Sequence, residues 1–175
     1  MNFIKQIFQN ISNQSLIFES NGNTITSYES NEIVLASGDK NIMNLLKEMI
    51  DCPEIVTINV SHGGEAIIGD VETSTIDLTD MIGASTYGIS VEQSLLHETL
   101  EQYYVQVKGR SFRNAHNFAA QQEVNYANPG HRLDEQSIDI DRGEIIRTTV
   151  DPLGNKYTNI LYFNPTTMNI LLNMK

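Results

Sequence analysis

Apolar residues follow two kinds of spacing along this chain of 175 residues, and the spacing predicts where helices and strands lie. Helical spacing predicts a short helix at residues 2–10 and a longer one that begins at Asp39 and ends before Pro53. Short alternating or apolar runs between turn residues predict strands, the first three of them joined as an antiparallel meander. The predicted strands are residues 16–18, 24–28, 33–36, 55–60, 71–78, 144–150, 157–163 and 168–174, and residues 79–88 are expected to form a loop.

Two consecutive helices are expected in the middle of the chain. Ser90 is the expected N-cap of the first helix, with Glu92 and Gln93 in its first turn, as a capping box prefers. Residues 108–111 (KGRS) then supply a helix stop and a new N-cap for a second helix at about residues 112–124. Leu96, Leu100, Tyr103 and Val107 recur at helical spacing and are expected to form the buried stripe of the first helix.

The first of these helices carries an imidazole and two carboxylates close together. Because each helical residue advances by about 100°, His97 and Glu101 lie one above the other, at the margin of the buried stripe. A histidine and a carboxylate in this arrangement can occupy two corners of a zinc tetrahedron. Glu98 borders the same cleft and can serve as general base to a metal-bound water.

A third ligand is expected from the second helix. Two helices joined by a short connection pack side by side, so His116 can face His97 and Glu101. Two histidines and one glutamate are a known ligand set of catalytic zinc, with a fourth position open to water. Glu123 lies about 10 Å further along the helix axis than His116. It is expected either to orient a ligand from outside the metal sphere or to replace His116 as the third ligand.

Three further residues are candidates for stabilising an oxyanion in the transition state. His131 and Arg132 follow the second helix in a segment that we expect to be a loop returning to the mouth of the cleft, and Tyr126 lies shortly before them. The alternative interpretation of this segment is an exposed loop without a role in chemistry.

Composition limits the range of functions. The chain has 22 acidic and 11 basic side chains, and a net charge of −11 argues against nucleic-acid binding, which needs a basic surface. Cys52 is the only cysteine, so no internal disulfide is expected. At this length we expect one domain, residues 1–175.

The sequence also bears on location. It contains no apolar run long enough to cross a bilayer, and its first residues lack the apolar core of a signal peptide. We therefore expect no membrane association. The protein is expected to be cytoplasmic, or to be delivered by a non-classical route such as a toxin secretion system or a phage particle.

The motif HExxE at residues 97–101, followed by a helix that carries AHNFAA, resembles the HExxH signature of zincin metallopeptidases. More narrowly, residues 95–123 resemble small metallopeptidase domains of bacterial polymorphic-toxin and phage-associated proteins. Position 101 departs from the common pattern, which has histidine there. The resemblance implies an α+β, zincin-like fold in which a mixed or antiparallel sheet packs on an active-site helix and a second ligand-bearing helix. We also expect β-hairpins at both ends of the chain.

These features together predict a zinc-dependent metallopeptidase that hydrolyses a peptide or protein substrate with Glu98 as the base. In zincins an edge strand above the cleft pairs with an extended substrate, and residues 71–78 are the candidate for that strand. A further protein partner, such as an immunity protein or a particle component, is compatible with the resemblance. Two alternatives are a non-catalytic accessory protein of a phage particle or toxin cassette, and a dormant protease domain that needs a partner to complete its cleft.

Overall fold

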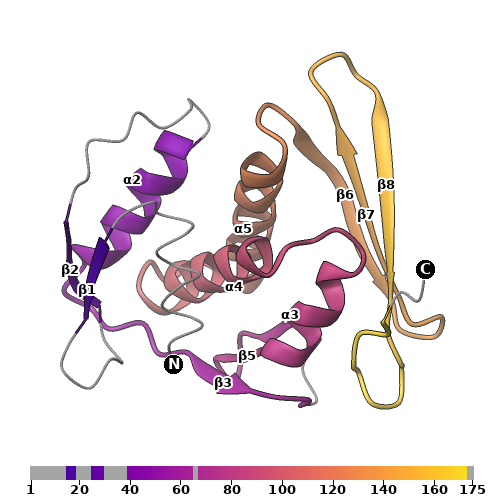
Figure 1. Cartoon of the computed structure of the whole chain (residues 1–175), viewed down its shortest axis with the longest axis horizontal. Coiled ribbons are helices and arrows are strands. Elements are labelled where there is room, and N and C mark those ends of the chain that lie inside the picture. Colours follow the sequence, from indigo (N-terminus) through magenta and orange to yellow (C-terminus); the bar gives the residue numbers. More distant parts are fainter. Residues whose placement is uncertain (1–14, 19–24, 30–38, 65–66, 173–175) are drawn as a thin grey trace. The chain divides into compact units, whose positions relative to one another are not determined.

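The computed structural model describes residues 15–18, 25–29, 39–64 and 67–172 (Figure 1). The helix predicted at residues 2–10 and the strand predicted at 33–36 lie outside these residues. Contacts along the chain group it into two compact units, Met1–Ile55 and Val56–Lys175, and each is described by itself. The prediction of one domain over residues 1–175 stays a prediction.

Among its described residues, the first unit contains a two-stranded antiparallel sheet and one helix. Strands β1 (Ser15–Phe18) and β2 (Ile25–Glu29) pair as the sequence predicts, with Leu16 opposite Tyr28. Helix α2 (Asp39–Ile50) also lies where its apolar spacing predicts it, and buries Ile42 and Leu46. The local sequence patterns of this unit are therefore confirmed wherever the structure describes it.

The second unit begins with a small mixed sheet, in which β3 (Asn59–Ser61) and β4 (Gly69–Asp70) flank β5 (Thr75–Asp77). Strand β3 runs parallel to β5, whereas β4 runs antiparallel to it. The predicted strands at 55–60 and 71–78 are thus present only in part. The prediction that the second of them is an edge strand is wrong, because β5 has a neighbour on each side, and β3 and β4 form the two edges.

Helix α3 (Leu78–Ser85) occupies the segment that we expected to be a loop. The side chain of Asp77 caps it by accepting hydrogen bonds from the backbone N–H groups of Thr79 and Asp80. Gly83 lies inside the helix and is buried against Ile170. Its lack of a side chain permits close packing at this position.

Helices α4 (Val91–Gln106) and α5 (Phe112–Ala127) pack against each other as the short connection between them predicts. The capping box of Ser90 and Gln93 is present at the start of α4. Burial on α4 is wider than the predicted stripe, because all residues from Ser94 to Tyr104 are buried, whereas Val107 is only half-buried. The polar side chains of this middle stretch are therefore held inside the protein.

The C-terminal part is an antiparallel sheet of three strands, β6 (Arg132–Asp139), β7 (Glu144–Val150) and β8 (Lys156–Tyr162), in that spatial order (Figure 1). Strands β7 and β8 agree closely with the prediction. The loop predicted at residues 131 and 132 is present at His131 but wrong for Arg132, which pairs with Val150 at the start of β6. In place of the last predicted strand, the described residues contain an isolated bridge between Phe163 and Ile170.

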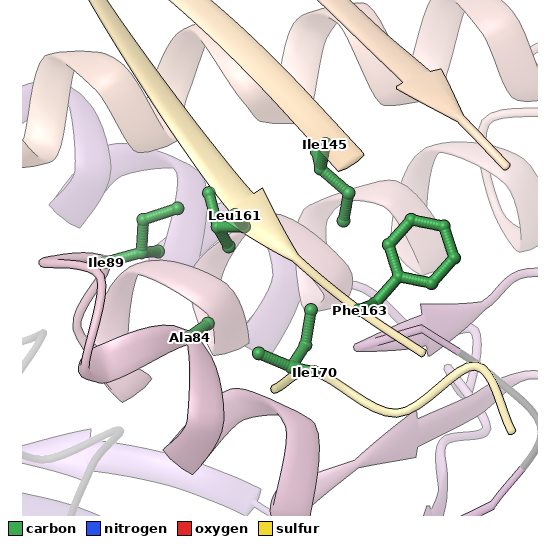
Figure 2. Packing of buried hydrophobic residues seen from close by; sticks show 6 residues of the cluster. All are labelled: Ala84, Ile89, Ile145, Leu161, Phe163 and Ile170. Carbon is green, nitrogen blue, oxygen red and sulfur yellow. The ribbon is translucent and has the colours of Figure 1, made fainter. Parts of the chain in front are cut away.

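A compact apolar cluster lies between α3 and this sheet (Figure 2). Its buried members come from α3, the segment before α4, strands β7 and β8, and the chain after β8. The unit as a whole is α+β with mostly antiparallel strands, and no helix among the described residues is both long and apolar enough to span a bilayer. The cluster consists of Ala84, Ile89, Ile145, Leu161, Phe163 and Ile170.

Candidate metal centre

Three side chains predicted as metal ligands meet at the interface of α4 and α5. The Nε2 atom of His97 lies 3.2 Å from Nδ1 of His116 and 3.3 Å from Oε2 of Glu101. Nδ1 of His116 and Oε2 of Glu101 lie 2.7 Å apart. His97 and Glu101 are 5% and 3% exposed, and His116 is partly exposed. Two nitrogens and one carboxylate oxygen therefore converge on one point at the edge of the core.

This triangle of atoms fits a small divalent cation. Zinc binds nitrogen and oxygen ligands at about 2.0–2.2 Å, and in a tetrahedron the shortest of these bond lengths separates the ligand atoms by roughly 3.3 Å. Two edges of the triangle, at 3.2 and 3.3 Å, match this value. The edge of 2.7 Å between His116 and Glu101 would have to open by roughly half an ångström to accept the ion.

Glu123 contacts His97 on the side away from this triangle. Its Oε2 atom lies 3.0 Å from Nδ1 of His97, and its Oε1 atom accepts a hydrogen bond from Arg147. A carboxylate on the second nitrogen of a histidine fixes the ring and directs the other nitrogen toward a metal. Glu123 thus lies where it can orient His97. His116, and not Glu123, is the residue whose ligand atom lies close to those of His97 and Glu101.

Two residues that the sequence analysis missed complete this arrangement. Gln136 on β6 lies with its Nε2 atom 2.9 Å from Nε2 of His116, and Arg147 on β7 donates from Nε to Oε1 of Gln136 at 3.1 Å. Nothing in the sequence around either residue distinguishes it from a polar residue on a strand surface. Their role depends on the register of β6 against β7, which pairs the two directly.

The charges of the cluster favour a cation. Burial lowers the pKa of His97, but its hydrogen bonds to Glu101 and Glu123 outweigh burial and raise this pKa to about 10. Burial raises the pKa of both carboxyls, yet the bonds to the histidines at Glu101 and the charge of Arg147 at Glu123 outweigh it, so each pKa is about 2. Two ionised carboxylates inside the protein therefore hold positive charge between them.

Glu98 differs from the other carboxylates of the cluster. It is 7% exposed, and no described residue donates a hydrogen bond to it. Burial, together with the nearby charges of Glu101 and Glu123, raises the pKa of Glu98 to about 8. A carboxyl group with a pKa close to neutrality can both accept and release a proton under physiological conditions.

These side chains line a cavity of about 460 Å³. Residues 67–72, which include the edge strand β4, form one wall, and Gly69 lies directly against the Glu98 carboxylate. Three residues of the apolar cluster, Ile89, Ile145 and Leu161, form another part of the wall, so the cavity has a charged region and an apolar region. The charged region consists of His97, Glu98, Glu101, His116, Glu123 and Arg147. The apolar region consists of Ile67, Ile68, Ile89, Ile145 and Leu161.

The three candidates for transition-state stabilisation do not line this cavity. The ring of His131 packs on that of Tyr157, with 5.8 Å between their centroids, and Arg132 forms an ion pair with Asp134 on the surface. Tyr126, near the end of α5, is likewise not among the lining residues. Among the described residues, the cavity is thus lined without these three side chains.

Comparison with known proteins adds no assignment. No protein-family model, curated protein or solved structure matches this chain. The site itself consists of a triangle of ligand atoms, a carboxyl group with a pKa of about 8, and a cavity that both of them face.

Proposed function

We propose that this chain is a zinc-dependent metallopeptidase with a zincin-like active site. The observation that carries the proposal is the convergence of His97, Glu101 and His116 beside the carboxyl group of Glu98 in one cavity. Two histidines and one glutamate suit zinc better than magnesium or calcium, which prefer sites made of oxygen atoms. When bound, such an ion supplies Lewis acidity, which activates water and polarises a carbonyl group.

Glu98 is the general base in this proposal. It takes a proton from a water molecule in the cavity as the water oxygen bonds to the carbonyl carbon of the substrate. It then donates that proton to the amide nitrogen as the C–N bond breaks, so that an amine and a carboxylic acid leave. Its raised pKa, about 8, suits both steps, because a group with a pKa near the working pH transfers protons in either direction.

The walls of the cavity favour an extended peptide with a large apolar side chain. Strand β4 is an edge strand, and residues 67–72 line the cavity, so an extended chain can pair with this edge. The apolar wall can take up an aliphatic or aromatic side chain of that peptide. We therefore expect cleavage next to Leu, Ile, Met or Phe residues of the substrate in preference to charged ones.

One observation favours a second candidate. The distance of 2.7 Å between Nδ1 of His116 and Oε2 of Glu101 is that of a hydrogen bond, so hydrogen bonds can hold the cluster together without a metal ion. In that case the cluster is a buried polar network, and the chain is a non-catalytic structural or accessory protein. The two candidates differ in whether the purified protein retains a metal ion.

Elemental analysis combined with a cleavage assay tests the proposal. The full chain is loaded with zinc, dialysed against metal-free buffer, and incubated with a mixture of peptides whose cleavage is followed by mass spectrometry. We expect stoichiometric zinc, and cleavage that 1,10-phenanthroline stops and added zinc restores. A folded protein that retains no zinc and cleaves no peptide would support the accessory role instead.

Gly69→Ala tests the position of the base separately from the metal. A Cβ atom at position 69 would overlap the Glu98 carboxylate, so this side chain must move while the ligand triangle stays in place. Because a displacement of about 1 Å can lower catalysis by about 10²-fold, we expect a loss of this order in kcat with unchanged zinc content. Gly64→Ala is the matched control, because the new Cβ meets Ser61 and Asp77 instead of the site.

A further inference from the structure

The guanidinium group of Arg147 contacts both residues that lie against the far ring nitrogens of the two histidines, namely Glu123 and Gln136. We call these two residues the outer partners of the histidines. Arg147 donates from Nη1 to Oε1 of Glu123, whose other oxygen lies 3.0 Å from Nδ1 of His97. Arg147 also donates from Nε to Oε1 of Gln136, whose Nε2 atom lies 2.9 Å from Nε2 of His116. One residue of β7 thus sets the orientation of a polar group behind each of the two imidazoles.

The two imidazoles meet opposite kinds of partner. A guanidinium only donates hydrogen bonds, so the group that faces it must present oxygen. Glu123 presents its second carboxylate oxygen to Nδ1 of His97, which donates to it, and Nε2 is therefore the nitrogen that faces Glu101 and His116. The only side-chain oxygen of Gln136 accepts the hydrogen bond from Arg147, so the NH₂ group of Gln136 faces His116.

This NH₂ group has a definite consequence for His116. An amide NH₂ donates and cannot accept, so Nε2 of His116 must be the acceptor. The single ring proton then lies on Nδ1, the atom that faces Oε2 of Glu101 at 2.7 Å. A metal needs that same nitrogen without its proton, and the proton must move to Nε2, where it would oppose the NH₂ group of Gln136.

We propose that Gln136, oriented by Arg147, is a positioning residue that keeps His116 in the tautomer unsuited to zinc and thereby weakens the metal site. For zinc to bind through Nδ1 of His116, the Gln136 amide must turn over and give up its bond to Arg147. This inference rests on the metal site proposed above. It adds that the affinity of the site is held down by a residue outside the ligand set.

Gln136→Glu tests the inference because the expected result is a gain in zinc affinity, and misfolding would not produce such a gain. A carboxylate at position 136 accepts from both Arg147 and Nε2–H of His116, so Nδ1 is left free for the ion. Changes in the outer partner of a histidine ligand alter metal affinity by about 10–100-fold, and we expect zinc to bind the variant more tightly by at least about 10-fold. The affinity is measured with zinc alone, in competition with a chromophoric chelator.

Ser137→Glu is the control for added charge, because it introduces the same carboxylate on the neighbouring, exposed position of β6. It should leave zinc affinity within about 2-fold of wild type, since an exposed charge is screened by solvent. A gain in Ser137→Glu equal to that in Gln136→Glu would overturn the inference, as would no gain in Gln136→Glu.

A second measurement needs no variant. In the metal-free wild-type chain, the ¹⁵N chemical shifts of His116 report which ring nitrogen carries the proton, and we expect Nδ1. A proton on Nε2 would overturn the inference even if the protein binds zinc well. Failure of the proposed function is a different result, namely a chain that binds no zinc both with Gln136 and with glutamate at this position.

Discussion

Replacing Glu98 by glutamine is expected to lower peptide hydrolysis by about 10²–10⁴-fold while the zinc content stays unchanged. Glutamine has nearly the shape of the buried carboxyl group but cannot accept the proton of a water molecule. Glu98 contributes no atom to the ligand triangle, so the variant should still bind the ion. The measurements are kcat on a peptide substrate and zinc per chain by elemental analysis, both on folded protein.

Glu92→Gln is the matched control for this variant. Glu92 lies in the first turn of the same helix but does not line the cavity, so its replacement should leave turnover within about 2-fold of wild type. Glu98→Gln also removes a buried group whose pKa burial raises to about 8, so we expect its stability at neutral pH to be no lower than that of wild type. Unchanged turnover in Glu98→Gln would remove this residue from the chemistry.

The sequence predicted those parts of the site whose cause is local. The spacing of His97 and Glu101 is a property of the helix itself, and the capping box of Ser90 and Gln93 fixes where that helix begins. The short connection at residues 107–111 brings α5 back beside α4, and this is enough to place His116 near both residues. None of these steps needs knowledge of the rest of the chain.

The sequence did not predict what tertiary packing decides. Arg147 and Gln136 meet because β6 and β7 pair in one register, and a shift of either strand by one residue would turn one of the two side chains to the other face. The edge of the small sheet was assigned to the wrong strand for a similar reason. Strand β4 has only two residues, too few for a recognisable pattern, yet its pairing with β5 makes it the wall of the cavity.

The extent of burial around α4 was also not predicted from the sequence. Polar residues on a helix usually face water, and the pattern of Leu96, Leu100 and Tyr103 suggested one buried stripe with the site at its margin. In the structure the cover extends around the middle of the helix, including Glu98 and Glu101. Burial raises the pKa of both carboxyls, but at Glu101 the hydrogen bonds to the two histidines outweigh burial and lower the pKa, whereas Glu98 has no such bonds. The same sequence motif on an exposed helix would have neither effect.

Removal of either histidine is expected to abolish stoichiometric zinc binding, but the two variants should differ in stability. His97 is bonded to both Glu101 and Glu123, so His97→Ala leaves two buried carboxylates with fewer partners. Loss of one partner of a buried ion pair costs about 3–5 kcal/mol, and we expect a loss of this order in the free energy of unfolding of the metal-free chain. Urea denaturation measures it.

His116→Ala is the variant that isolates the metal. The side chain of His116 is 27% exposed, and Glu101 keeps its contact with His97 when His116 is removed, so we expect a folded protein. Its zinc affinity should fall by more than the roughly 100-fold that loss of an outer partner can cost, because a direct ligand is lost. His62→Ala, at an exposed histidine of the loop after β3, should retain full zinc. If His116→Ala retained zinc as well as His62→Ala does, the ion would bind elsewhere. The side chains that meet between α4 and α5 would then form only a hydrogen-bonded network.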